Sequence, residues 1–101
     1  MRKTVVVTKE LNRKKEELIT FNNIPLVYNF FKNRGFVHNQ DKPVNYLNLM
    51  MLKHHLKKAI EKAQHKNDTE ELTKLQPVYE ELTHILARKT TKLDKLSVSF
   101  T

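Results

Sequence analysis

Cysteine and tryptophan are absent from this sequence of 101 residues, and glycine occurs only once, as Gly35. Without cysteine there can be no disulfide framework, which is typical of a chain in a reducing compartment. Phosphate-binding loops of the Walker and Rossmann types need several glycines, because only glycine lets backbone N–H groups approach a phosphate closely. The sequence therefore excludes nucleotide-binding sites of these two kinds.

Long apolar runs are also absent. The first ten residues, MRKTVVVTKE, are basic like the start of a secretory signal, but their apolar run is only three valines. No run approaches the roughly 20 apolar residues of a membrane span. The hydrophobic fraction of 39% and the charged fraction of 30% are those of an ordinary globular domain. We therefore expect one cytoplasmic domain over residues 1–101, with no membrane partner and no small-molecule cofactor.

The middle of the chain has the periodicity of two long helices. Asn45 can cap a helix from about 46 to 66, and Asp68 with Glu71 forms a capping-box pattern at the start of the next helix. The two helices have apolar stripes at alternating spacings of three and four, which predicts a long antiparallel αα-hairpin over 45–89. Met50 and Met51 fall outside the first stripe, so we expect the preceding helix to cover them.

The N-terminal unit is predicted over residues 3–34. The β-branched run at 3–8 favours a strand, and the charged segment at 9–19 favours a short helix. Pro25 and Gly35 stand where a helix commonly begins and ends, which predicts a second helix near 24–34. Residues 35–44 should form a connector.

The C-terminal segment, residues 90–101, ends in KLSVSF, whose apolar and polar residues alternate as in a half-buried strand. It could pair with the first strand, and the alternative is that both termini are frayed. The expected fold class is therefore mainly α: a small helical domain with the long hairpin and short terminal β-strands. A winged-helix variant is compatible with this order of elements.

The formal net charge of +8 is unevenly distributed. The first predicted long helix, residues 45–66, carries +4 and the second, residues 67–87, carries −4, so the hairpin is nearly neutral as a whole. Residues 1–44 carry +5 and residues 88–101 carry +3. We expect a polyanion to be attracted mainly to the ends of the chain.

Basic side chains near the top of the hairpin are the candidate site. If these elements meet, a single nucleic-acid-binding patch would comprise Arg13, Lys14, Lys32, Arg34, Lys42, Lys53, Lys57 and Lys58. Phosphate contacts of this kind are salt-sensitive and select sequence weakly, so base reading would need amides nearby. The amides available are Asn29, Asn33, Asn39, Gln40 and Asn48.

Catalytic and metal-binding patterns are weak by comparison. The five histidines lie in no H-E-x-x-H motif, and adjacent histidines on a helix point about 100° apart. Consecutive glutamates on a helix likewise splay apart, and no serine lies in a nucleophile-elbow pattern. We expect neither an enzyme nor a metal site.

Two functions remain after these exclusions. The first is a small basic nucleic-acid-binding accessory or regulatory protein that contacts DNA through its phosphates. The alternative is a protein–protein interaction module, such as an inhibitor, adaptor or assembly factor. It would bind a protein partner or form a homodimer through the helical hairpin or through a C-terminal tail containing Leu93, Leu96 and Phe100.

Overall fold

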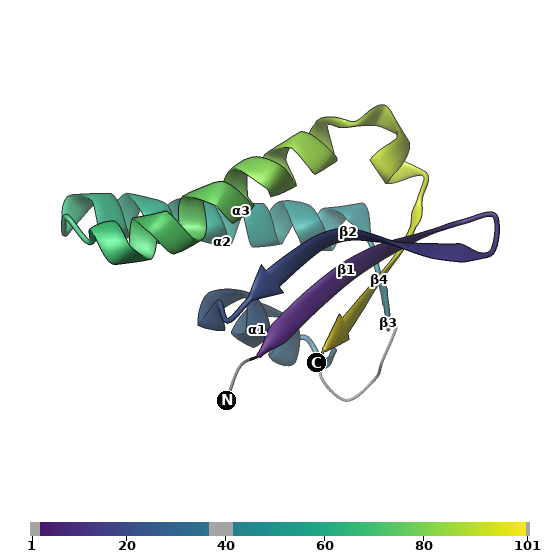
Figure 1. The fold of residues 1–101 in the computed structure, drawn as a ribbon, viewed down its shortest axis with the longest axis horizontal. Helices are drawn as coiled ribbons and strands as arrows, with labels where there is room; N and C mark the ends of the chain where they lie inside the picture. Colours follow the sequence, from purple (N-terminus) through teal and green to yellow (C-terminus); the bar gives the residue numbers. More distant parts are fainter. Residues whose placement is uncertain (1–2, 37–41, 101) are drawn as a thin grey trace.

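The computed structural model describes residues 3–36 and 42–100 (Figure 1). The protein is a mixed α and β domain, whereas the sequence predicted a mainly α one. In chain order its elements are β1 (Thr4–Leu11), β2 (Lys14–Asn22), α1 (Pro25–Lys32), β3 (Lys42–Val44), α2 (Tyr46–His65), α3 (Thr69–Ala87), the 3₁₀ helix η1 (Lys89–Lys92) and β4 (Lys95–Phe100).

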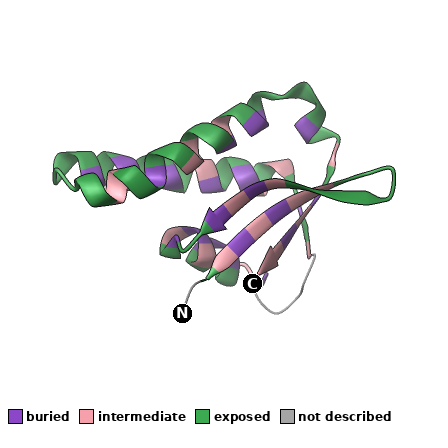
Figure 2. Ribbon diagram, in the orientation of Figure 1, coloured by how far each residue is buried: buried purple, intermediate pink, exposed green. Residues whose placement is uncertain are grey.

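The strands form one antiparallel sheet in the order β2-β1-β4-β3. Side chains along β1 alternate between the two faces, so that Val5 and Val7 are buried while Val6 and Thr8 are only partly covered (Figure 2). The neighbouring strands show the same alternation, and their buried residues are Ile19, Phe21, Leu96 and Val98. The helices therefore cover one face of the sheet.

The core lies between that face and the three helices. Each buried aliphatic or aromatic side chain contributes about 1.5–3 kcal/mol through its removal from water. The helices contribute Val27, Phe30 and Phe31 from α1, Leu49, Leu52 and Leu56 from α2, and Leu75, Leu82, Ile85 and Leu86 from α3.

The predicted pairing of the first and last strands is confirmed. Val5 lies opposite Phe100, and Val7 lies opposite Val98. The hydroxyl groups of Thr8 and Ser97 lie 2.8 Å apart across the same two strands. The alternative of two frayed termini is therefore wrong for the described residues.

The predicted helix at 9–19 is wrong, because this segment forms a β-hairpin. Leu11 pairs with Lys14 across a two-residue turn in which Asn12 and Arg13 have φ of 52° and 66°. Two consecutive residues with positive φ are characteristic of a type I′ turn, whose twist matches that of the strands. The charges pair across the strands, as Lys9 does with Glu16 at 3.9 Å.

The predicted boundaries of the three helices are close to those observed. Pro25 occupies the first turn of α1, and Gly35 just beyond its end has φ of 78°. The Asn45 side chain accepts the Asn48 backbone N–H at 2.8 Å, and the Asp68 side chain accepts that of Glu71 at 3.1 Å. These capping bonds satisfy backbone donors that have no partner within the helix.

The two long helices, α2 and α3, lie side by side and are joined by a short turn through Asn67 (Figure 1). Pro77 lies inside α3, which continues through it as one helix. No helix within residues 3–36 and 42–100 is both long enough and apolar enough to cross a membrane.

The expectation that α1 covers the start of α2 is wrong. Met50 and Met51 are 37% and 40% exposed, and Leu47 in the first turn is 66% exposed. The reason is that α1 spans only eight residues and meets α2 further along, where the rings of Phe30 and His55 are 5.5 Å apart. An apolar patch therefore remains on the first turns of α2.

Substitution of Arg13 distinguishes the hairpin from a helix by the sign of its effect. A non-glycine residue in the left-handed region costs about 1–2 kcal/mol, and Arg13→Gly removes this cost. Glycine loses more conformational entropy on folding, which offsets part of the gain. The net effect should be a free energy of unfolding that is higher by about 0.5–1 kcal/mol. Arg13→Ala should bring no such gain. Urea unfolding of both variants measures the difference. If Arg13→Ala were more stable than Arg13→Gly, as it would be in a helix, the hairpin would be contradicted.

Candidate functional site

The basic residues predicted to form one patch are placed in separate parts of the molecule. Arg13 and Lys14 are exposed at the tip of the β1–β2 hairpin, which projects from the body on the side away from α1 (Figure 1). Lys32 is exposed in the last turn of α1. The separation follows from the hairpin, since a helix at 9–19 could have packed beside α1 whereas the strands extend away from it.

Two other predicted residues interact with the chain around α1. The Arg34 guanidinium lies 3.7 Å from the centroid of the Phe30 ring, and its Nη1 donates to the Phe30 carbonyl at 3.0 Å. Lys42 Nζ donates to the Gly35 carbonyl at 3.2 Å and lies 4.8 Å from the centroid of the Phe36 ring. These contacts stabilise the end of α1 and fix where the two cations lie.

Lys53 and Lys57 lie on the side of α2 that faces α3. Both line a surface depression of about 200 Å³ with Tyr79 of α3. Lys57 also lines a neighbouring depression with Glu61 and Glu80. The carboxylates reduce the positive potential on this side of the helix pair.

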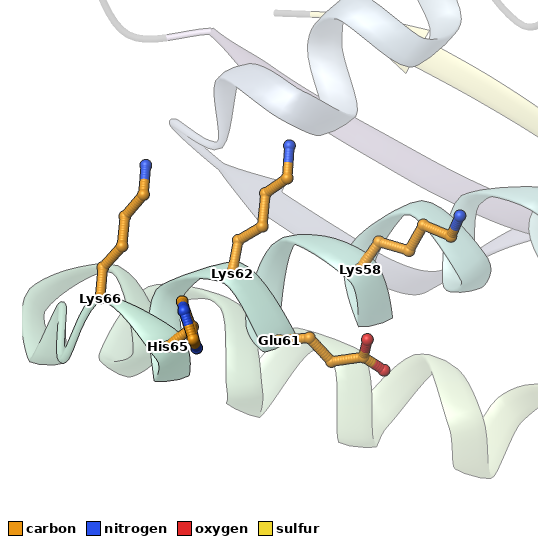
Figure 3. A pocket seen from close by; sticks show the side chains of 5 residues that line it. All are labelled: Lys58, Glu61, Lys62, His65 and Lys66. Atoms are coloured by element: carbon orange, nitrogen blue, oxygen red, sulfur yellow. The ribbon is translucent and has the colours of Figure 1, made fainter.

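Another side of α2 carries Lys58 and Lys62, and Lys66 follows them as the C-cap of the helix. We call these three residues the lysine row. Their spacing of four residues places them on neighbouring turns, about 6 Å apart along the axis. All three are exposed, and Lys62 and Lys66 extend in parallel from the helix (Figure 3). With Glu61 and His65 they line a surface depression of about 530 Å³.

The lysine row is a surface on which positive charge exceeds negative charge. None of its members forms an ion pair with any residue in the described part of the chain. Glu61 is the one acidic side chain that lines the depression. Lysines near the C-terminal end of a helix interact favourably with its dipole, which can explain the presence of Lys62 and Lys66. It does not explain Lys58, which lies two turns from the end.

A second depression lies between α1 and α2. Its volume is about 230 Å³, and it is lined by Leu26, Asn29, Phe30, Asn33, Arg34 and His55. His55 precedes Lys58 by three residues, so the two side chains lie on neighbouring turns of one side of α2. Both depressions are therefore lined from the same side of α2.

Of the amides predicted to read bases, Asn29 and Asn33 lie in this depression. Asn48 does not, because its side chain accepts the Asn45 backbone N–H at 3.1 Å in the capping box of α2. Asn39 and Gln40 fall outside the described residues.

Sequence reasoning included Lys58 but missed Lys62 and Lys66. The signal was present in their spacing, since lysines at i, i+4 and i+8 share one side of a helix. It was obscured because the charges of the two long helices were added together. No three histidine or acidic side chains of the described residues gather closely enough to hold a metal ion.

No protein-family model, no curated protein and no solved structure matches this chain. The candidate site therefore depends on the geometry of the chain itself.

Removal of the Arg34 side chain tests whether it has a structural role. We expect Arg34→Ala to lower the free energy of unfolding by about 1 kcal/mol, because it loses a cation–π contact and a charge-assisted hydrogen bond, both partly exposed. For a domain of this size, that lowers the Tm by about 4–8 °C. Lys32→Ala, at an exposed position of the same helix end, is the matched control and should change the Tm little. Equal effects of the two substitutions would contradict this role.

Proposed function

We propose that this protein is a small basic nucleic-acid-binding accessory or regulatory protein that binds DNA through phosphate contacts. The observation that carries the proposal is the lysine row, which presents three exposed and unpaired cations on one side of a rigid helix. A rigid row of cations is matched to a ligand with regularly repeated negative charge.

The dimensions of the lysine row support a polyanion rather than a single small anion. From Lys58 to Lys66 the helix axis advances by about 12 Å. One strand of B-DNA places a phosphate about every 3.4 Å along its axis, so the row spans several consecutive phosphates. Each lysine is then free to contact a different phosphate, and binding should weaken steeply as salt is added.

The uncovered face of the sheet is a poorer candidate surface. Sheets that bind single strands do so with exposed aromatic side chains on which bases stack. Here the outward positions of β1 and β4 are held by small side chains such as Val6, Thr8, Ser97 and Ser99. The aromatic Phe100 of β4 instead contacts Tyr28 of α1, with their ring centroids 6.0 Å apart.

Within this proposal the α2–α3 hairpin is the scaffold that holds the lysine row. The winged-helix variant belongs to the same proposal, with the β1–β2 hairpin as the wing. Arg13 and Lys14 at its exposed tip would then add phosphate contacts on a longer duplex.

A protein–protein interaction module is the second candidate function. It is favoured by the exposed apolar side chains of Leu47, Met50 and Met51 on α2, together with Leu93, which is 86% exposed. The C-terminal segment is a poorer basis for it than the sequence suggested, since Leu96 is buried in the sheet and Phe100 packs on α1.

Neutralisation of the lysine row should weaken DNA binding and reduce its dependence on salt. The slope of log K against log salt falls by about 0.9 for each lost phosphate contact on a duplex, and by about 0.7 on a single strand. The triple variant Lys58→Ala, Lys62→Ala, Lys66→Ala should therefore lower the slope by about 2–3. Fluorescence anisotropy with mixed-sequence DNA, over a salt series that starts at about 50 mM, measures it.

The matched control is Arg88→Ala, Lys89→Ala, Lys95→Ala, which removes three exposed cations, two directly after α3 and one at the start of β4. It should leave the slope and the affinity nearly unchanged. Equal losses in the two triple variants, or no binding by the original chain at low salt, would reject the proposal. A dimer or a protein complex that survives high salt would favour the second candidate.

A further inference from the structure

We infer that the depression between α1 and α2 binds one unstacked nucleobase of a single strand whose phosphates lie on the lysine row. This inference rests on the proposed function and adds to it a preference for unpaired nucleotides. It is carried by the depression of about 230 Å³ lined by Leu26, Asn29, Phe30, Asn33, Arg34 and His55.

The guanidinium of Arg34 offers a planar surface for stacking. Its Cζ lies 3.7 Å from the centroid of the Phe30 ring, and Nη1 donates to the Phe30 carbonyl at 3.0 Å, so two contacts hold the group in place. Arg34 is only partly buried, so the group remains accessible from the depression. Unpaired bases stack on such guanidinium planes as they do on aromatic rings.

Polar groups in the same depression can bond the edge of a base. Asn29 and Asn33 are one turn apart on α1, and each amide has donors and an acceptor. His55 is exposed and adds a ring nitrogen from α2, held by its contact with Phe30. A planar heterocycle with donors and acceptors on its rim satisfies this set of groups, whereas an aliphatic chain does not.

The size of the depression suits one ring system. Typical small-molecule pockets measure about 300–1,000 Å³, which exceeds the 230 Å³ found here. A base within a duplex is stacked and paired, and extracting it costs a few kcal/mol. The site should therefore favour a single strand, in which bases are already free.

The neighbouring lysine row supplies the phosphate contacts that such a base needs. His55 belongs to the depression and Lys58 follows on the next turn of the same side of α2. A strand whose base occupies the depression can continue along α2 with its phosphates beside Lys62 and Lys66.

The test compares a short single-stranded DNA of mixed sequence with a strand of equal length and charge in which the central sugars carry no base. Because stacking contributes about 1–3 kcal/mol per base, the complete strand should bind about 5- to 150-fold more tightly. Arg34→Lys keeps the charge and removes the planar group, so it should weaken binding of the complete strand and leave the base-free strand unchanged. An RNA strand of the same sequence shows whether the sugar matters.

Asn33→Ala is a second variant, at an exposed position where folding should not depend on the side chain. Asn33→Ala should also reduce the ratio of the affinity for the complete strand to that for the base-free strand. The salt dependence of binding should remain that of the original chain. Equal affinity for the complete and base-free strands would overturn this inference and leave phosphate binding intact. The inference would also be overturned if either variant lost as much affinity for the base-free strand as for the complete strand. No binding of either single strand would overturn this inference, and the proposed function would fail with it only if a mixed-sequence duplex also does not bind at low salt.

Discussion

The one-sided burial of the sheet is the constraint on which the rest of the structure depends. β1 lies between β2 and β4, and its Val5 and Val7 are 1% and 0% exposed beneath the helices. A shift of register by one residue would move these valines to the solvent face, so their burial fixes the alignment of the strands. It also fixes which sides of α1 and α2 face the core, and thereby which side of α2 carries the lysine row.

The helix pair is neutral in total charge but not in its distribution of charge. Most of the positive side chains lie on α2 and most of the negative ones on α3, so adding the charges conceals a basic side. This is why the sequence led us to expect a polyanion mainly at the ends of the chain. The engagement of Arg34 and Lys42 could not be predicted either, since it depends on the Phe30 and Phe36 rings and on backbone carbonyls brought together by folding.

The parts of the fold that local chemistry determines could be predicted. Asn45, Asp68 and Gly35 mark helix ends through capping and positive φ, and the alternation in the last strand identifies β4. β2 was missed because its first half consists of lysine and glutamate, which favour a helix, and because its turn contains no glycine. β3 has only three residues, one of which is Pro43. A strand of this length is too short for its pattern to be recognised.

The most direct test of the central claim is a nuclear magnetic resonance titration of the isotope-labelled protein with a short single-stranded DNA at low salt. The account predicts that the largest backbone amide shifts follow α2 from His55 to Lys66, with further shifts at Asn29, Asn33 and Arg34. Shifts confined to the tip of the β1–β2 hairpin, or to the exposed apolar residues at the start of α2, would contradict it.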